Sequence, residues 1–354
     1  MTNLPKAVLY YSPKSVWSAA GIWDSEEKGY GSDEIDRRVV DLGKGENYDP
    51  TFLRLNPKAT VPVLVVPYEN SLGEDTESRY KALIETKVGT PSQTIVEFLD
   101  KSRSAISSTQ TTSAAPAPAL SPATIAATMS CSVIIDILHA ETANPNTLVY
   151  VNARDDESLK TLAKGIAPSL QRRQEALKEY LSQAENGSIR VSDKVKKLWV
   201  EKLDATGLIL AVLVDAEKPQ EALGEQAKAN RIAFFRTARQ AWEVNMSDVF
   251  TQLSKEMAGP YALGDQFSIA DLHLGGWLSR VAKLAGATKE DDGSTVVSKL
   301  EKRIGGGFGL PRDFITEQAR RENSKTDRVT KVGAFWDALR ERGSWKKVYE
   351  TGLY

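Results

Sequence analysis

The sequence predicts an α/β domain over residues 1–103, followed by a larger all-α domain over residues 121–354. Short apolar runs alternate with amphipathic segments in the first part, whereas the second part has helical periodicity throughout. The segment 104–120 between them is rich in Ser, Thr, Ala and Pro and contains no charged residue. Because such a composition buries too little apolar area to fold by itself, we expect a linker or mobile loop there.

The first domain opens with a strand and a helix. The apolar run 7–11 is followed by Ser12 and Pro13, which is typical of the end of a buried strand. An amphipathic helix should follow and end at Gly29, since glycine is a common helix stop. The other elements of this domain are expected in the following order: strands at 35–42, 61–66 and, more weakly, 80–84, and a helix that begins at Ser92. This order predicts a small mixed sheet with helices on its faces.

The second domain is expected to consist of long helices. Ser121 and Pro122 suit the N-cap and first position of a helix that runs through Met129 to His139. A helix over 158–184 contains Pro168, which should break or kink it. Further helical segments are expected at 191–216, 222–257, 268–284 and 330–341.

The composition excludes several classes of function. Among the 354 residues, 46 basic and 47 acidic side chains leave a net charge of −1, which argues against a nucleic-acid-binding surface. A single cysteine, Cys131, and two histidines cannot supply a zinc cage, so we expect no metal. No apolar stretch approaches the roughly 20 residues of a membrane span. Since no secretory signal opens the chain, we expect a cytoplasmic protein.

Three local patterns, taken in order, are more specific. They are the segment 9–18 (LYYSPKSVWS), the segment 56–64 (NPKATVPVL) with 92–99 (SQTIVEFL) downstream, and the segment 263–271 (LGDQFSIAD). Together they resemble the glutathione transferase superfamily, and the layout is similar to its large fungal-type and ganglioside-induced-protein-like members. The resemblance implies a thioredoxin-like N-terminal domain followed by an enlarged helical glutathione-transferase C-terminal domain. It also implies glutathione as co-substrate and a small hydrophobic molecule as second substrate, and it allows a homodimer.

The second pattern carries the expected backbone contact with glutathione. In the family the proline that corresponds to Pro62 is cis, and a cis bond would turn the N–H and C=O of Val61 outward. These groups can then pair like a strand with the cysteinyl backbone of the tripeptide. The alternative is an ordinary proline at the start of a strand. Lys58, in the same pattern, is a further substrate-binding candidate.

Ser92 is the candidate for binding the other end of glutathione. The resemblance places the γ-glutamyl carboxylate there, where a hydroxyl and free helical N–H groups make a good anion site. A plain N-cap is the alternative, and the two roles are compatible. The family usually has Glu or Gln just before this serine, whereas this chain has Pro91. Glu85 and Thr86 are a substitute if residues 87–91 form an inserted loop.

The first pattern should hold the group that activates the thiol. A free thiol has a pKa of ~8.5. Lowering this pKa by about two units requires about 2.7 kcal/mol of thiolate stabilisation. A hydroxyl at the N-terminal end of a helix can supply much of this. Ser15 matches the serine of phi members, Ser12 matches that of theta-like members, and Tyr11 is a weaker candidate. Each could instead be a cap or turn hydroxyl. Because no cysteine occurs in this turn, the thiol-exchange chemistry of omega- and beta-like branches is disfavoured.

Two further expectations concern the helical domain. Met129 lies on the helix that walls the electrophile pocket in this family, together with Ile134 and Leu138. In the third pattern, Ser268 and Asp271 are spaced as a capping box, which has a role in folding.

The sequence leaves three functions open. The first is a glutathione transferase that activates the thiol for attack on a small hydrophobic electrophile. The second is a non-catalytic protein of the same fold that binds ligands or partners, and the third is a glutathione-dependent lyase or isomerase of small metabolites. Pro91 and the long insertion between residues 104 and 230 favour the second.

Overall fold

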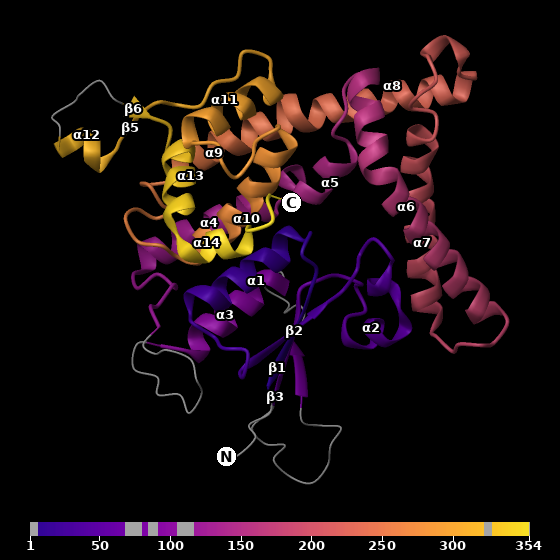
Figure 1. Cartoon of the computed structure of the whole chain (residues 1–354), viewed down its shortest axis with the longest axis horizontal. Helices are drawn as coiled ribbons and strands as arrows, with labels where there is room; N and C mark the ends of the chain where they lie inside the picture. Colours follow the sequence, from indigo (N-terminus) through magenta and orange to yellow (C-terminus); the bar gives the residue numbers. More distant parts are fainter. Residues whose placement is uncertain (1–5, 68–79, 84–90, 105–116, 322–327, 354) are drawn as a thin grey trace, which may run out of the picture.

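The computed structural model describes residues 6–67, 80–83, 91–104, 117–321 and 328–353. A four-stranded sheet forms the N-terminal part, and the chain beyond residue 120 is dominated by helices (Figure 1). The predicted α/β plus all-α fold is confirmed. Within the described residues, no helix is both long and apolar enough to span a membrane.

The sheet has the strand order β2-β1-β3-β4. Its strands are β1 (Ala7–Tyr11), β2 (Ile35–Val39), β3 (Val63–Pro67) and β4 (Tyr80–Leu83). β2 runs parallel to β1, β3 is antiparallel to β1, and β4 is antiparallel to β3. β2 ends three residues earlier than expected, because the Asp41 carboxylate accepts a hydrogen bond from Gly43 N (2.9 Å) and starts a turn.

Helices cover both faces of this sheet. They are α1 (Val16–Glu27), α2 (Pro50–Leu55) and α3 (Pro91–Ser102). On the face covered by α1 and α3, Leu9 of the sheet is buried together with Ile95 of α3. On the opposite face, Val63 is buried together with Phe52 of α2. This topology is that of a thioredoxin-like domain, as the resemblance implies.

The helical domain is built around α10. Its helices are α4 (Ile125–His139), α5 (Pro145–Tyr150), α6 (Asp156–Glu185), α7 (Asp193–Leu213), α8 (Glu225–Arg239), α9 (Ser247–Glu256), α10 (Ile269–Leu284), α11 (Gly293–Ile304), α12 (Glu317–Arg321), α13 (Lys331–Glu341) and α14 (Gly343–Val348). The irregular and short elements are a π-helical stretch at Gln240–Met246, 3-10 turns at Glu46–Tyr48, Glu141–Ala143 and Gln220–Ala222, and the strand pair β5 (Phe314–Ile315) and β6 (Arg328–Val329). Every residue of α10 from Ile269 to Ala282 is buried, so this helix forms the centre of the core.

The predicted capping box at the start of α10 is confirmed. The Asp271 carboxylate accepts hydrogen bonds from Ser268 N (2.7 Å) and Ser268 Oγ (2.6 Å). It also accepts one from Ala262 N (2.6 Å), which ties the preceding loop to the helix. These bonds satisfy buried donors and fix the first turn of the central helix.

The C-terminal end of the predicted linker is packed. Residues 105–116 lie outside the described residues, but Leu120 is buried and its N–H donates to Asp100 Oδ1 (2.9 Å). Lys28 Nζ forms a buried ion pair with the same carboxylate (2.8 Å) and also donates to Pro118 O (2.5 Å). Residues 117–120 are thus a linker without regular secondary structure, held in place by the buried pair of Lys28 and Asp100.

The expected start of α4 is also wrong. The helix begins at Ile125 with Thr124 as its N-cap, and Ser121 lies before it. The Ser121 hydroxyl donates instead to Asp100 Oδ2 (2.5 Å), so it serves the junction of the two domains and leaves the cap to Thr124.

The break expected at Pro168 is absent from α6, which is described over its whole length. The helix runs unbroken from Asp156 to Glu185. Pro168 and Lys164 are both exposed, so the Lys164 carbonyl that loses its intrahelical partner can bond water.

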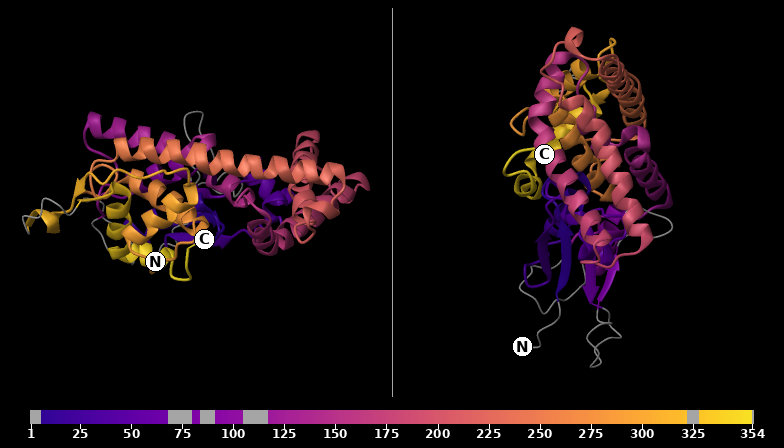
Figure 2. Two further views of the ribbon diagram at one scale, coloured as in Figure 1. Left: turned by 90° about the horizontal axis from the view of Figure 1, so that it is seen from above. Right: turned by 90° about the vertical axis from the view of Figure 1, so that its right-hand side faces the viewer.

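α6 and α7 form a long arm that reaches back to the sheet domain. Figure 1 shows the two helices beside α2, and in the right-hand view of Figure 2 the arm faces the viewer. Trp199 of α7 is fully buried, and its Nε1–H donates to Tyr48 O (3.0 Å). Leu177 of α6 is buried in the same cluster. Part of the predicted insertion therefore packs against the sheet domain and connects the two domains.

Candidate functional site

The candidate site lies at one edge of the sheet. Tyr10 in β1 pairs with Val63 at the start of β3, and Leu64 pairs with Leu83 at the end of β4. The turn after β1, the segment before β3 and the N-terminus of α3 therefore meet at the same edge (Figure 1). The structure brings together three segments that are far apart in the sequence.

The turn over residues 12–18, here called the serine turn, is held by its own hydroxyls. Ser15 is the N-cap of α1, and its Oγ accepts a hydrogen bond from Ser18 N (3.2 Å). Ser18 Oγ accepts from Ser12 N (3.3 Å), and Ser12 O accepts from Ser15 N (3.0 Å). Because the Ser15 oxygen accepts the helix amide, its proton stays available for an outside acceptor.

Both predicted serines lie in this turn. Ser12 is 5% exposed and Ser15 is 8% exposed, so each hydroxyl is largely shielded from water. Among the described residues, no hydrogen bond involves the Ser12 hydroxyl. The geometry therefore presents two candidate donors side by side, of which only Ser15 also caps the helix.

Val61 lies in a loop that side-chain hydrogen bonds hold in place. The Val61–Pro62 bond is cis, as the resemblance implies. Asn56 Nδ2 donates to Thr60 O (2.8 Å), and Asn47 Nδ2 donates to Ala59 O (2.8 Å). The N–H and C=O of Val61 make no hydrogen bond with any described residue. They are available for strand-like pairing with a ligand backbone.

Ser92 lies one position further into its helix than expected. α3 begins at Pro91, and Ser92 is buried in its first turn, so it is not the N-cap. Proline suits the first helical position, because its missing N–H has no partner there in any case. The proposed substitutes Glu85 and Thr86 lie outside the described residues.

Two other predicted residues flank the site. Lys58 is exposed in the loop that precedes Val61. Tyr11, the last residue of β1, is half-buried and packs on the sheet face covered by α1 and α3. Lys58 is therefore on the surface beside this edge, whereas Tyr11 contributes to packing.

Met129 is placed away from the serine turn. It is 65% exposed on the outer face of α4. It precedes His139, the α4 residue that stacks on Trp17 of the turn, by ten positions, which is about 15 Å along a helix. Ile134 and Leu138 are buried in the core of the helical domain. The part of α4 that reaches the serine turn is therefore its C-terminal end.

Three aromatic residues that the sequence analysis did not assign to the site meet beside the serine turn. The ring of Trp17, in the first turn of α1, stacks on His139 with 3.9 Å between centroids. His139 Nε2 lies 3.1 Å from His273 Nδ1. Burial lowers the pKa of His139 to about 4, and burial together with His139 lowers the pKa of His273. Both imidazoles are therefore neutral at neutral pH.

Only one sequence signal bears on these histidines. They are the two histidines of the chain, and both lie on segments with helical periodicity. No local spacing indicates that residues 139 and 273 meet, because the contact depends on how α4 and α10 pack together.

Two glycines of α10 allow α1 to approach closely. A Cβ at Gly275 would lie 2.4 Å from Trp23 Cζ3, and one at Gly276 would lie 3.1 Å from Val16 O. One turn further along α10, Arg280 Nη2 donates to Lys14 O (2.6 Å), so it holds the serine turn directly. The position of the turn is thus set by the helical domain.

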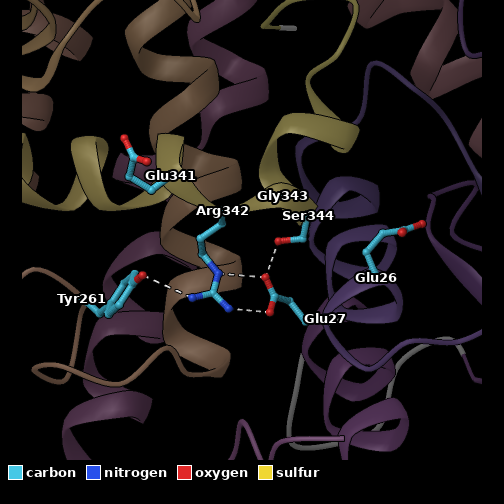
Figure 3. A pocket seen from close by; sticks show the side chains of 7 residues that line it. All are labelled: Glu26, Glu27, Tyr261, Glu341, Arg342, Gly343 and Ser344. Carbon is cyan, nitrogen blue, oxygen red and sulfur yellow. Dashed lines mark hydrogen bonds and ion pairs between the residues drawn. The ribbon is translucent and has the colours of Figure 1, made fainter. Parts of the chain in front are cut away.

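A separate hollow of about 460 Å³ lies at the other end of α1. Figure 3 shows Arg342 at its centre, paired with Glu27 and with Tyr261. α1 has 12 residues, about 18 Å of helix, which separates this hollow from Ser15. It belongs to the contact between α14 and α1 and not to the serine turn.

In the described ranges, no three or more His, Cys, Asp or Glu side chains gather as metal ligands do. Burial raises the pKa of the Cys131 thiol to about 11, so it stays protonated.

No protein-family model and no curated protein sequence matches the chain. Among solved structures, it is similar to glutathione transferase F2 from Populus trichocarpa (15% identity, TM-score 0.43, 98% of each chain covered). It is similar to Gtt2 from Saccharomyces cerevisiae (15%, 0.45, 96% of this chain and 99% of that chain). It is also similar to the beta-etherase LigF from Sphingobium (14%, 0.45, 98% and 100%).

Proposed function

We propose that this chain is a glutathione-using enzyme of the glutathione transferase superfamily. It activates the tripeptide thiol for attack on a small hydrophobic electrophile. The observation that carries the proposal is the shared sheet edge, where the serine turn follows β1 and the loop with the unpaired backbone groups of Val61 precedes the neighbouring strand β3. This edge offers a hydroxyl that can donate a hydrogen bond to the thiolate, together with backbone groups that can pair with the tripeptide like a strand.

The backbone of glutathione would bind by pairing with Val61. The cysteinyl N–H and C=O would pair with the C=O and N–H of Val61, as a short added strand does. The Ser92 hydroxyl and the first N–H groups of α3 would donate hydrogen bonds to the γ-glutamyl carboxylate, since a helix N-terminus carries partial positive charge. Lys58 would face the tripeptide from the neighbouring loop.

The thiolate would be stabilised at the serine turn. Ser15 accepts Ser18 N and can donate its proton to the sulfur, in a charge-assisted hydrogen bond. The N-terminal end of α1 adds the favourable field of the helix dipole. In the reaction, the sulfur forms a bond to an electrophilic carbon. A leaving group departs with its electron pair, or a proton is taken up after addition.

A second candidate is a non-catalytic ligand- or partner-binding protein of this fold. The observation that favours it is the arm, which covers α2 and fixes the loop beside the site through Trp199 and Tyr48. Pro91, in place of the acidic or amide residue usual in the family, favours it too. A glutathione-dependent lyase or isomerase needs the same bound thiolate and is a further variant of the first proposal.

We also propose a cellular location and an oligomeric state for the protein. The lone Cys131 remains a thiol, which suits the reducing cytoplasm. The outer face of α4 exposes the apolar side chains of Ile125, Met129 and Val133, and this face could serve a homodimer. Size-exclusion chromatography with light scattering tests the assembly.

The decisive experiment combines binding with turnover. Isothermal calorimetry with millimolar glutathione should show binding to the full chain, and a conjugation assay should show turnover. Ser15→Ala should abolish most turnover while it preserves binding. Binding without turnover in the wild-type chain would support the non-catalytic alternative. No binding at all would overturn the enzymatic proposal.

A further inference from the structure

The loop over residues 56–61, here called the pairing loop because it ends at Val61, contains a strained residue. Ala59 has a φ of 56°, in the left-handed region that residues other than glycine seldom adopt. Such a conformation persists only where the surrounding structure holds it. The contacts of Ala59 therefore determine how the backbone enters Val61, two residues further along the chain.

Two contacts hold Ala59 in this conformation. Its carbonyl accepts a buried hydrogen bond from Asn47 Nδ2 (2.8 Å). Its side chain is 5% exposed and belongs to an apolar cluster that includes Leu177 of α6 and Trp199 of α7. The sheet domain supplies the first contact, and the arm supplies much of the second.

The arm also holds the turn that carries Asn47. This residue lies in the 3-10 turn Glu46–Tyr48, and the carbonyl of the last residue of the turn accepts a buried hydrogen bond from Trp199 Nε1 (3.0 Å). At the start of the turn, Gly45 lies close to α6, because a Cβ there would lie 3.1 Å from Ala176 Cβ. Both helices of the arm therefore contact the turn.

Trp199 itself is firmly placed within the arm. Its side chain is fully buried, and its ring stacks on that of Tyr180 in α6 with 5.4 Å between centroids. Truncation of this side chain would remove the hydrogen bond to the Tyr48 carbonyl and open a cavity in the cluster that contains Ala59. One side chain of the arm thus supports both contacts of Ala59.

We propose that the arm positions the pairing loop for its ligand, with Trp199 as the positioning residue. That this ligand is glutathione rests on the proposed function. Strand-like pairing needs the N–H and C=O of Val61 in a defined orientation, because hydrogen bonds weaken steeply when their angle or length departs from the preferred geometry. Trp199 acts through the 3-10 turn, Asn47 and Ala59, and its role requires no contact with the ligand.

This route is separate from the serine turn. The serine turn is held by its own hydroxyls and by Arg280, whose Nη2 donates to Lys14 O (2.6 Å). The contacts that connect Trp199 to Ala59 involve neither α1 nor α10. A change at Trp199 should therefore weaken binding of the tripeptide and leave activation of its thiol unchanged.

Hydrogen exchange tests the connection without any ligand. The amides of Lys58 and Ala59 donate to Asn56 Oδ1 (3.0 Å) and Asn56 O (3.0 Å), so their exchange rates report how well the pairing loop is ordered. In Trp199→Ala we expect both amides to exchange about tenfold faster than in the wild-type chain. Trp199→Phe keeps a ring in the cluster but lacks the N–H, and it should give an increase of about threefold. The milder variant keeps the test valid if the larger truncation does not fold.

Leu210→Ala is the matched control for truncation of the arm. Leu210 is another buried residue of α7, about 16 Å further along the helix from Trp199, and it packs in a different cluster. Its truncation should leave exchange in the pairing loop unchanged. Unchanged exchange in both Trp199 variants would overturn the inference, and so would an equal increase in Leu210→Ala.

Calorimetry and kinetics test the effect on the tripeptide. The Kd of glutathione should rise about tenfold in Trp199→Ala and about threefold in Trp199→Phe. The KM for glutathione should rise in parallel, whereas kcat should change less than about twofold. A merely structural loss would lower the active fraction and thus kcat at unchanged KM, and this result would contradict a positioning role.

A double variant tests the route through Asn47. If Trp199 acts through this residue, Trp199→Phe should weaken glutathione binding less than about twofold in a chain that already carries Asn47→Ala. A combined loss equal to the product of the two single losses would show that the effects are independent, which would overturn the route.

Two outcomes separate this inference from the proposed function. If the wild-type chain binds glutathione and both Trp199 variants bind it equally tightly, the inference is overturned and the proposed function stands. If exchange in the pairing loop responds as expected but the wild-type chain does not bind glutathione, the hold of the arm on the loop is supported and the proposed function fails.

Discussion

Arg342 and Glu27 join the last helix of the chain to the first. Arg342 Nε lies 2.8 Å from Glu27 Oε1, and Nη2 lies 2.5 Å from Oε2 (Figure 3). Ser344 donates to the same carboxylate, and Arg342 lies over the ring of Phe267 at 4.0 Å. Burial raises the pKa of Glu27, but the hydrogen bonds from Arg342 and Ser344 outweigh it and hold the pKa below its ordinary value.

Removal of the Arg342 side chain should therefore lower the free energy of unfolding. The pair is largely buried, with side-chain exposures of 26% for Arg342 and 9% for Glu27, so Arg342→Gln leaves a carboxylate without its counter-charge. We expect the free energy of unfolding in urea to fall by about 2–3 kcal/mol. Arg321→Gln, which breaks an exposed pair with Glu317, should cost less than about 0.5 kcal/mol. Equal losses in the two variants would contradict a role for burial.

Gly275 should not tolerate a side chain. In Gly275→Ala, the new Cβ would lie 2.4 Å from Trp23 Cζ3 and 3.1 Å from Leu339 Cδ1, so α1 and α10 must move apart. We expect a loss of about 2–3 kcal/mol in unfolding free energy. Gly165→Ala is the matched control, because this α6 glycine has nothing within 4 Å of an added Cβ. It should stabilise the chain by about 0.5–1 kcal/mol. A neutral Gly275→Ala would show that the two helices do not need this contact.

Ser15 should affect both folding and thiol activation. Ser15→Ala removes the cap on Ser18 N and should cost about 1 kcal/mol of stability. The substitution should also raise the pKa of the thiol of bound glutathione. As a result, kcat/KM at neutral pH should fall by at least about tenfold. The thiolate absorbance of the bound tripeptide, titrated with pH, reports the pKa directly. Ser15→Thr keeps both the cap and the hydroxyl and should retain activity. If Ser12→Ala has the larger kinetic effect instead, Ser12 is the thiolate donor.

The two histidines should make stability depend on pH. Burial lowers the pKa of His139 from 6.5 to about 4, so the folded state binds fewer protons than the unfolded state between these values. The unfolding free energy should consequently fall as pH decreases from 6.5 to 4, by on the order of 2–3 kcal/mol for His139. The lowered pKa of His273 acts in the same direction.

Substitution isolates the contribution of His139. His139→Gln should flatten the pH profile of stability in this window, while carboxylates contribute equally to both proteins. Urea unfolding at several pH values provides the measurement. Parallel profiles for the wild-type and variant chains would show that His139 is not buried in neutral form.

Much of the fold could be predicted from local pattern. β1 was expected and found at residues 7–11, and the Ser268–Asp271 capping box was recognised from spacing alone. Strand alternation, caps and glycine stops are properties of a few consecutive residues, so the sequence displays them. Where a local sequence signal and a tertiary contact favoured different structures, the tertiary contact determined the structure. Ser121 bonds Asp100 instead of capping α4, and Pro168 remains inside an unbroken helix.

The candidate site divides in the same way. The resemblance assigned Ser12, Ser15 and Val61 to the site, and the structure places each of them in a short segment that ends or begins a strand. The family resemblance assigned Met129 to the electrophile pocket, and the structure places it on the outer face of α4, about 15 Å along the helix from His139. His139 was on the same helix, but only the packing of α4 shows that it is the residue beside Trp17.

The sequence by itself determined the order of the elements, the hydroxyl character of the serine turn and the capping box of α10. Only the tertiary structure decided which side chains surround that turn. His273 and Arg280 reach it because α10 packs against α1 through Gly275 and Gly276. The energy of that contact comes from apolar surfaces that lie far apart in the chain, and no pattern of neighbouring residues encodes it.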